Sequence, residues 1–187
     1  CRVTALKNSK NIFPGKLLFL TVDPEIIKDE KFQKGLTKEY LSKYNISPKN
    51  IIFEITERTA ISDYKSFSKT LEHYTEQGYK IAIDDTGSGY SGLETISKTK
   101  PHYIKLDIEL IRNIDKDKFK QSLIKCFVEF AKSTKLKLIA EGIETEGELK
   151  ILIDLGVYAG QGCFISKPVP DFREIPNSKK NIILSYN

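Results

Sequence analysis

Acidic residues recur at the ends of the apolar, β-rich segments of this sequence. They follow four separate segments, as Glu54 and Glu57, Asp84 and Asp85, Asp107, and Glu141 and Glu144. One such acid alone is usually a solvated loop residue or a helix N-cap, but repetition across four segments makes coincidence a poor explanation. Carboxylates that converge in a partly desolvated site repel one another unless a cation neutralises them. Because hard oxygen ligands select Mg²⁺, Mn²⁺ or Ca²⁺, the pattern predicts a site for one or two divalent ions.

A lysine interrupts one of these apolar segments. Lys105 lies two residues before Asp107, and the period of two in a strand puts both side chains on one face. A lysine that points into the interior of a barrel is costly unless carboxylates or phosphates surround it. Lys105 is therefore either a structural ion-pair partner or a functional group. We favour the functional role, in which it orients an attacking water or stabilises charge on a phosphate.

Three glycines, Gly87, Gly89 and Gly92, follow a strand pattern in a G-x-G-x-x-G spacing, ahead of an expected helix. In a dinucleotide-binding fold such glycines meet a pyrophosphate at the N-terminus of a helix. Asp84 and Asp85 occupy that approach here and would repel a bare phosphate. We therefore interpret the glycines as a loop beside the metal site, and keep a nicotinamide enzyme as a minor alternative.

Other site chemistries find little support in the sequence. The two histidines, His73 and His102, fall in a helical pattern and just before a strand, so neither a zinc site nor a serine triad is indicated. Three cysteines, Cys1, Cys126 and Cys163, form no C-x-x-C pair. This pattern fits the reducing cytoplasm better than a secreted scaffold.

The composition limits the class of protein and its partners. At 187 residues, with 40% hydrophobic and 29% charged residues, the chain suits one compact domain. No apolar run reaches the ~20 residues of a membrane-spanning helix. The net charge of +5 comes from lysines scattered over most segments, without the basic stripe of a nucleic-acid-binding protein. We expect no DNA or RNA partner and no membrane contact by this segment.

Strand and helix patterns alternate along the chain. The β-rich runs cover residues 16–22, 50–56, 79–85, 102–108, 136–142 and 161–166. Helical patterns cover residues 1–9, 30–44, 63–78, 117–133 and 146–156. This alternation implies parallel strands joined by right-handed crossovers, in either an open doubly wound sheet or a closed β/α barrel. In both folds the carboxyl ends of the strands share one face, where the acidic residues should converge.

Local signals inside the helical patterns agree with these boundaries. Thr145 and Glu148 fit a capping box at a helix start, and Gly78 and Gly156 lie where left-handed C-caps belong. In the 117–133 segment an apolar stripe at helical spacing is expected to face the core. Its members are Phe119, Leu123, Cys126, Phe127 and Phe130.

Six stretches carry a resemblance to a known family: LFLTVDP, FEITE, IDDTGSGYSGL, IKLD, IAEGIET and GQGCFISKPVP, in that order. The chain resembles the EAL family of bacterial cyclic di-GMP phosphodiesterases. The resemblance implies an α/β fold, a TIM-type (β/α) barrel that lacks its first strands in this chain. Residues 1–187 would form a single EAL-like domain, with residues 171–187 as its C-terminal tail. It also implies hydrolysis of one phosphodiester bond of cyclic di-GMP to linear pGpG with Mg²⁺ or Mn²⁺, at a two-ion site if the site is complete.

The same resemblance implies roles for individual residues. The metal ligands would be Glu54, Asp84, Asp85, Asp107 and Glu141. Lys105 resembles the water-positioning lysine, and Glu141 also lies near where the attacking water would be deprotonated. Glu57 resembles the residue that holds the glycine loop. Glu144 and Gln161 match the remaining polar positions of the substrate pocket.

Departures from the family pattern weaken the expected chemistry. The Glu-Ala-Leu signature and its strand would lie before Cys1, and Thr21 stands where the family has a metal-binding asparagine. Thr86 also stands where the family often has phenylalanine. Losing a carboxylate and an amide ligand weakens a Mg²⁺ site. We therefore expect little or no turnover from the chain as written, and keep open a degenerate EAL module that binds cyclic di-GMP or only another protein.

The expected partners follow from the fold and the family. Without its first strands the barrel has exposed sheet edges, which need a partner or further chain to cover them. We expect a homodimer, with sensory or GGDEF domains as possible flanking parts of the full-length protein.

Overall fold

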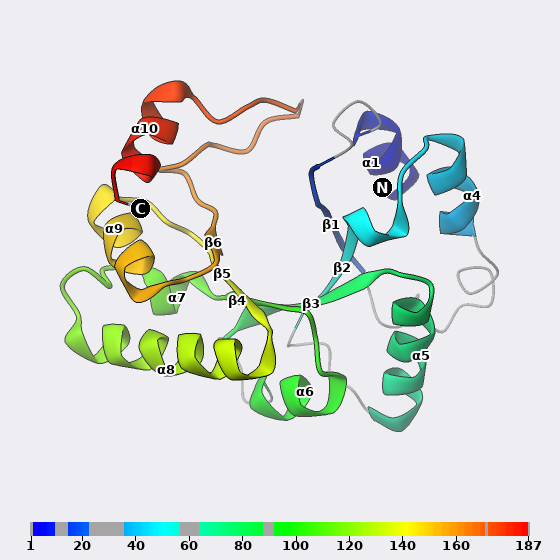
Figure 1. The fold of residues 1–187 in the computed structure, drawn as a ribbon, viewed down its shortest axis with the longest axis horizontal. Helices are drawn as coiled ribbons and strands as arrows, with labels where there is room; N and C mark the ends of the chain where they lie inside the picture. The colour runs from blue at the N-terminus through cyan, green and yellow to red at the C-terminus, as the bar shows by residue number, and fades with distance from the viewer. Residues whose placement is uncertain are drawn as a thin grey trace.

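The fold is a curled parallel sheet with helices on its outer side. The computed structural model describes residues 2–9, 15–22, 36–56, 64–87, 92–170 and 172–186. The strands are β1 (Leu18–Thr21), β2 (Ile51–Thr56), β3 (Lys80–Thr86), β4 (Tyr103–Leu106), β5 (Lys137–Ala140) and β6 (Ala159–Gly160). The helices are α1 (Arg2–Ser9), α4 (Leu36–Lys43), η1 (Pro48–Asn50), α5 (Tyr64–Glu76), α6 (Gly92–Thr99), α7 (Ile108–Ile111), α8 (Lys118–Thr134), α9 (Glu146–Leu155) and α10 (Asn177–Ser185). Figure 1 shows the curved sheet with α5, α6 and α8 outside it.

The order of the strands decides between the two folds that alternation allows. A doubly wound sheet reverses about its first strand, so its strands are out of chain order. Here all pairs are parallel and the order is β1-β2-β3-β4-β5-β6, which is the winding of a TIM-type (β/α) barrel. In the described part of the chain β1 and β6 are the edges and do not pair with each other. The expected TIM-type barrel is therefore confirmed, as an open six-stranded half-barrel in the described residues.

Most of the predicted helices are present. α1, α5, α8 and α9 agree with their patterns to within two residues at each end, and α6 follows the glycines as expected. Residues 30–35 of the predicted 30–44 helix lie outside the described residues, and α4 occupies most of the remainder. The patterns predict neither α7 nor α10, and α10 lies within the 171–187 tail. Among the described helices, none combines the length and the hydropathy needed to cross a bilayer.

The predicted helix caps are confirmed. Glu148 N donates to Thr145 Oγ1 at 3.2 Å, and Thr145 N donates to Glu148 Oε2 at 3.0 Å, which completes the capping box of α9. Gly156 ends the same helix with φ 84°, and Gly78 follows α5 with φ 93°. Both glycines adopt the left-handed conformation that a side chain disfavours.

The two faces of the strands bury different kinds of side chain. Outward residues such as Phe53, Ile83 and Leu106 join the apolar clusters under the helices. The inward residues form a separate cluster in the barrel interior, here named the apolar layer: Phe19, Ile52, Ala82, Tyr103 and Ile139. Because strand side chains alternate, the next inward residues lie two positions further along each strand. They are Thr21, Glu54, Asp84, Lys105 and Glu141, here named the polar layer.

The sixth predicted strand is wrong. The 161–166 run forms turns, and β6 is a two-residue strand just before it. A Cβ at Gly162 would lie 2.2 Å from the backbone N and O atoms of Ile143, so the chain passes too close to that backbone for any side chain. Phe164 N donates to Ile143 O at 3.0 Å, and Ile165 N donates back to Gly162 O at 3.0 Å. The apolar run is therefore a turn packed against the loop after β5.

The predicted core face of α8 is also wrong except at Phe127, which is partly buried and packs against the core. Phe119 is 80% exposed and Phe130 42% exposed, and Cys126 is exposed as well. The sheet instead packs against Ile124, Val128 and Ala131. α8 carries apolar residues on two faces, and helical spacing alone cannot show which face the sheet covers.

Candidate functional site

Lys105 is the centre of the polar layer. It comes from β4, and its ammonium group lies 2.6 Å from Glu54 Oε1, 2.9 Å from Asp84 Oδ1 and 2.7 Å from Glu141 Oε1. The three carboxylates come from β2, β3 and β5. Lys105 is 5% exposed, and an ammonium group has three N–H donors, so each donor has one carboxylate acceptor. Strand alternation and the order of the sheet thus bring together four of the residues that the sequence singled out.

The electrostatics of this cluster follow from burial and charge. Burial alone would lower the pKa of Lys105, but hydrogen bonds to Glu141, Glu54 and Asp84 raise it above its ordinary value. Lys105 therefore stays charged. Burial, together with the nearby Asp84, raises the pKa of Glu141 to about 7 against the opposing effect of Lys105. A carboxyl group with this pKa can accept or release a proton near neutral pH.

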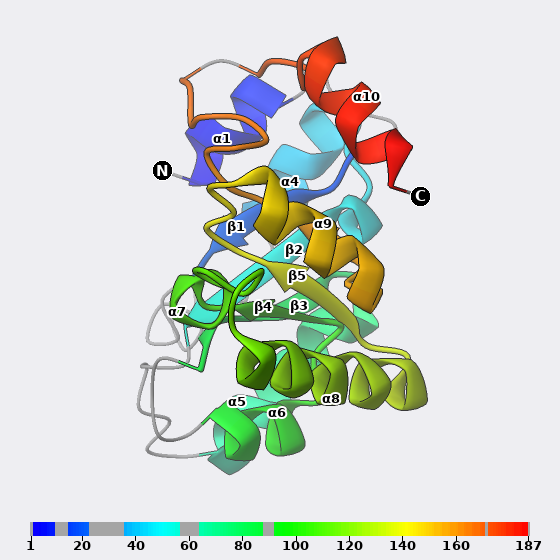
Figure 2. The same cartoon turned by 90° about the vertical axis from the view of Figure 1, so that its left-hand side faces the viewer.

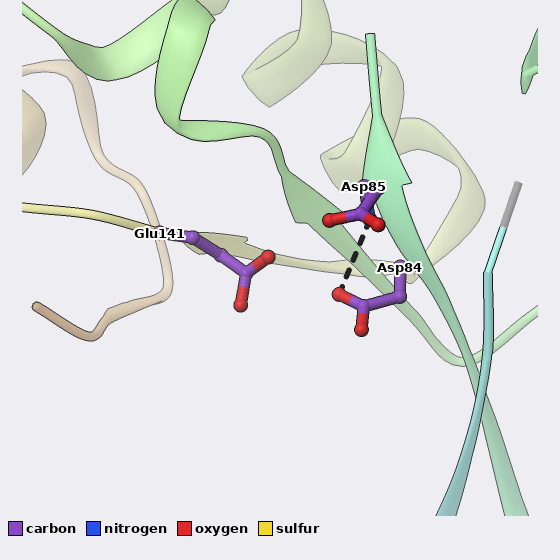
Figure 3. Close-up of side chains that lie close together, drawn as sticks. All are labelled: Asp84, Asp85 and Glu141. Atoms are coloured by element: carbon purple, nitrogen blue, oxygen red, sulfur yellow. Dashed lines mark hydrogen bonds between the residues drawn. The ribbon is translucent and has the colours of Figure 1, made fainter. Parts of the chain in front are cut away.

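Three acidic residues form a compact set of oxygen donors beside Lys105. Carboxylate oxygens of Asp84, Asp85 and Glu141 all lie within 4.8 Å of one another (Figure 3). Asp85 joins the set because the register of β3 against β4 shifts between Ile83 and Thr86, and Asp85 has φ 56°. Such a bulge re-aims a side chain that regular alternation would turn to the other face. The donor set is all carboxylate, which fits a hard divalent cation.

Glu54 is held by two partners at the edge of this set. Its Oε1 accepts from Lys105, and its Oε2 accepts a hydrogen bond of 3.1 Å from Thr21 Oγ1. Glu54 is 7% exposed, whereas Thr21 is exposed at the end of β1. Thr21 therefore fixes one oxygen of Glu54.

Asp107 lies at the same end of the sheet but has a different partner. Its Oδ1 accepts a hydrogen bond of 2.8 Å from Glu109 N, so the side chain is the N-cap of α7. Its backbone N donates to Thr86 O at 3.1 Å, which fixes it beside the end of β3. The carboxylate of Asp107 stands outside the compact set formed by Asp84, Asp85 and Glu141.

Two further predicted site residues, Glu144 and Gln161, lie on the loops that follow β5 and β6. Gln161 Nε2 donates to Glu141 Oε1, the oxygen that also bonds Lys105. Glu144 Oε1 accepts from Arg112 Nη2 at 2.8 Å. Glu57 lies outside the described residues.

The glycine segment is described at its two ends. Gly87 has φ 107°, and a Cβ there would lie 2.6 Å from Leu110 Cδ1 of α7. Gly92 begins α6. Close packing against α7 therefore accounts for Gly87 without a bound pyrophosphate.

The sequence does not predict two contacts of this region, the ion pair of Arg112 and the bond from Asn113 N to Glu148. Arg112, at the end of α7, pairs with Glu144, and Glu148 is a carboxylate only 3% exposed. The capping box predicts the local contacts of Glu148. No sequence signal links it to the loop after α7, because that contact spans 35 residues.

Comparison with known proteins agrees with this geometry. Residues 2–168 match the EAL domain. Cyclic di-GMP phosphodiesterase PdeF of Escherichia coli (strain K12) is 30% identical over 157 residues, which are 84% of this chain and 21% of PdeF. The chain thus spans about a fifth of the length of the curated relatives it matches.

Solved structures give the same answer for the fold. A standalone versatile EAL protein from Vibrio cholerae O395, in its c-di-GMP-bound form, superposes with a TM-score of 0.87 at 29% identity, over 96% of this chain and 76% of that one. The manganese/cy-diGMP complex of Klebsiella pneumoniae BlrP1 at pH 9.0 gives a TM-score of 0.79 at 31% identity, over 88% of this chain and 42% of that one. The curled sheet, the carboxylates at its carboxyl end and the sequence match together show that this chain belongs to the EAL domain family.

Proposed function

We propose that this chain is the cyclic di-GMP domain of a signalling protein and that its chemistry is hydrolysis of one phosphodiester bond to give linear pGpG. The observation that carries the proposal is the position of Lys105, enclosed by Glu54, Asp84 and Glu141 at the carboxyl end of the barrel. The name of PdeF and the c-di-GMP bound to the Vibrio cholerae protein support the choice of substrate.

The chain's own residues fit the requirements of this reaction. Glu54, Asp84, Asp85, Asp107 and Glu141 would hold Mg²⁺ or Mn²⁺, as a pair of ions if the site is complete. A bound divalent ion lowers the pKa of a water and stabilises charge on phosphoryl oxygens. When a bound ion takes over one of its carboxylate partners, Lys105 would orient the attacking water, and Glu141 would accept a proton from that water. The water oxygen bonds to phosphorus, the ribose 3′ oxygen leaves and takes up a proton, and no covalent enzyme intermediate is needed. Glu57, Glu144 and Gln161 would hold the glycine loop and the nucleotide.

A second candidate is a receptor that binds cyclic di-GMP without turning it over. The observation that favours it is Thr21, whose hydroxyl bonds Glu54 where the family has an amide. A hydroxyl is shorter and a weaker ligand than an amide carbonyl, so the ion beside Glu54 would bind less tightly. Binding of the nucleotide would then remain while hydrolysis is slow or absent. In the interaction-only form of this candidate, the module would bind another protein instead.

One experiment separates these candidates. The chain is incubated with cyclic di-GMP and Mn²⁺, and pGpG is followed by chromatography, while calorimetry with Ca²⁺ measures nucleotide binding. Production of pGpG supports the phosphodiesterase, with Glu141→Gln as an inactive control. Binding without product supports the receptor. A chain that neither binds nor hydrolyses the nucleotide rules out both, and leaves the interaction module.

We also propose that the domain forms a homodimer through the outer face of α8. Phe119, Leu123, Cys126 and Phe130 follow the i, i+4, i+7, i+11 spacing of a two-helix seam, and three of the four are exposed. A second copy supplies the same seam, so the contact can be symmetric. Light scattering should show a dimer that dissociates in the Phe119→Ser/Phe130→Ser variant, whereas Leu184→Ser on α10 should leave it intact. An unchanged mass for the double variant would contradict this surface.

The cellular setting is part of the same proposal. Cys126 and Cys163 are free, which accords with a cytoplasmic location. Because the chain spans about a fifth of its curated relatives, sensory or GGDEF domains elsewhere in the polypeptide would supply the regulation. Fractionation of cells that express the full-length protein tests the location.

A further inference from the structure

We propose that Glu148 is a positioning residue for nucleotide binding, because it fixes the pair Arg112 and Glu144, which contacts the nucleotide at the carboxyl end of the barrel. The proposal rests on the proposed function, and adds Arg112 and Glu148 to the residues that serve it.

The carboxylate of Glu148 accepts hydrogen bonds from three backbone amides. Its Oε1 accepts from Asn113 N at 2.8 Å, and its Oε2 accepts from Glu144 N at 2.9 Å and Thr145 N at 3.0 Å. Burial alone would raise the pKa of Glu148, but these N–H donors lower it below its ordinary value. Glu148 therefore remains a buried anion that holds three backbone amides.

These contacts exceed the needs of a helix start. A capping box requires of the Glu148 side chain only one bond, from the N-cap amide, which here is Thr145 N. The bond to Asn113 N instead reaches the loop after α7, where Asn113 has φ 58°. Glu148 thus joins the loop that follows β4 and α7 to the loop that follows β5.

The peptide unit between Arg112 and Asn113 is fixed at both of its polar groups. Its carbonyl oxygen accepts from Lys120 Nζ at 2.8 Å, and the next amide, Asn113 N, is held by Glu148. Glu144 is held through its own backbone N. The two side chains that these backbones carry meet at 2.8 Å. The pair is therefore set by contacts to the backbone as well as by its own charge.

The pair is placed and exposed as a ligand contact requires. The side chains of Arg112 and Glu144 are 43% and 45% exposed, and the loops that carry them follow the strands of Lys105 and Glu141. A guanidinium offers a planar fork to phosphate or carbonyl oxygens, and a carboxylate accepts from base N–H groups. An exposed ion pair contributes little to stability, so its fixed geometry is better explained by binding.

A matched pair of variants separates this role from a structural one. Glu148→Gln replaces one acceptor oxygen by an N–H₂ group that faces N–H donors. Thr145→Ala removes the other half of the capping box and destabilises α9, but leaves the Glu148 carboxylate and its three bonds in place. Calorimetry with cyclic di-GMP and Ca²⁺ is measured for both variants, for Arg112→Gln, and for Glu148→Gln/Arg112→Gln.

We expect Glu148→Gln to weaken nucleotide binding about tenfold, which is the effect of losing one hydrogen bond to a charged group. Thr145→Ala should lower the Tm as much as Glu148→Gln does, while its affinity for the nucleotide changes less than about twofold. The double variant should lose less binding than the sum of the two single variants, because part of the effect of Glu148 passes through Arg112. Equal effects of Glu148→Gln and Thr145→Ala on binding, or additive effects in the double variant, would overturn the proposal.

The side-chain Nε signal of Arg112, recorded by NMR without nucleotide, gives a readout that does not depend on the proposed function. It should shift in Glu148→Gln and stay in place in Thr145→Ala. A wild-type chain that binds no nucleotide would refute the proposed function and the nucleotide part of this inference. In that case an Arg112 signal that does not shift in Glu148→Gln would also refute the positioning of Arg112 by Glu148. A signal that shifts would support that positioning.

Discussion

The apolar layer and the polar layer lie two residues apart on the same five strands, yet they bury opposite kinds of group. The apolar layer closes the interior with Phe19, Ile52, Ala82, Tyr103 and Ile139. The polar layer buries an ammonium group among carboxylates. Buried ion pairs are weak contributors to stability compared with well-packed apolar groups. The difference indicates that the apolar layer serves stability, whereas the polar layer holds its charges at a cost in stability.

The two ends of the interior can also be compared through their lysines. Lys137, at the start of β5, donates to Tyr158 Oη at 2.8 Å and lies over the same ring. Lys105, at the other end of the interior, has three carboxylate partners and almost no exposure. The same residue type is thus an ordinary surface partner at one end and the neutralising charge of a buried cluster at the other. Figure 2 shows β4 and β5, the strands that carry these two lysines.

The largest effect is expected from Lys105→Met, which breaks the polar layer. Three largely buried carboxylates would lose the cation that they share in the described structure, so the free energy of unfolding at pH 8 should fall by about 3–5 kcal/mol. Turnover of cyclic di-GMP, if present in the wild type, should be lost. Urea unfolding and the pGpG assay measure the two effects. Lys137→Met is the matched control and should cost less than about 1 kcal/mol. Equal losses in the two variants would contradict the division into layers.

The sequence predicts the parts of this arrangement that depend on local rules. The period of two places Lys105 and its partners on the inner face, and the ends of parallel strands bring Glu54, Asp84 and Glu141 together. The capping box of Thr145 and Glu148 is a signal within one helical turn, and it is confirmed. These features need no knowledge of distant contacts.

The parts that fail depend on contacts between distant segments. The bulge that turns Asp85 inward is a backbone irregularity with no separate residue signal. The face of α8 that packs on the sheet is decided by which apolar row fits it, and both rows have helical spacing. Gly162 prevents a strand at residues 161–166 because Ile143 lies against it. In each case the deciding partner is far away in the sequence.

The apolar layer should be separable from the site above it. Ile52 is fully buried, and Ile52→Ala removes three carbon atoms from the layer, so unfolding should become easier by about 3 kcal/mol. Binding of cyclic di-GMP should change less than about twofold, because the carboxylates of the polar layer keep their partners. Thermal unfolding and calorimetry report the two quantities, with Ile52→Val as a milder control at about 1 kcal/mol. Parallel losses of stability and affinity would show that the layers act as one unit.

Thr21→Asn should increase the metal affinity of the polar layer and leave the apolar layer unchanged. An amide carbonyl reaches further than a hydroxyl and is a better oxygen ligand, so affinity for Mn²⁺ should rise about tenfold. Calorimetry with Mn²⁺ in the absence of nucleotide measures this directly. Thr21→Val, which removes the bond to Glu54 Oε2, should show no such gain. An affinity equal to that of the wild type would mean that position 21 does not reach the ion.

The smallest effect concerns a hydroxyl just beyond the bulge. Thr86 is 3% exposed, and its Oγ1 is a buried atom without a hydrogen-bond partner in the described structure. A desolvated hydroxyl without a partner is destabilising, and valine has nearly the same shape. Thr86→Val should therefore raise the free energy of unfolding by about 1 kcal/mol, measured by urea titration. Thr95 is equally buried but has interaction partners, so Thr95→Val should be neutral or destabilising. A loss of stability in Thr86→Val would show that the hydroxyl is satisfied in solution, and that the end of β3 is as fully paired as the polar layer beside it.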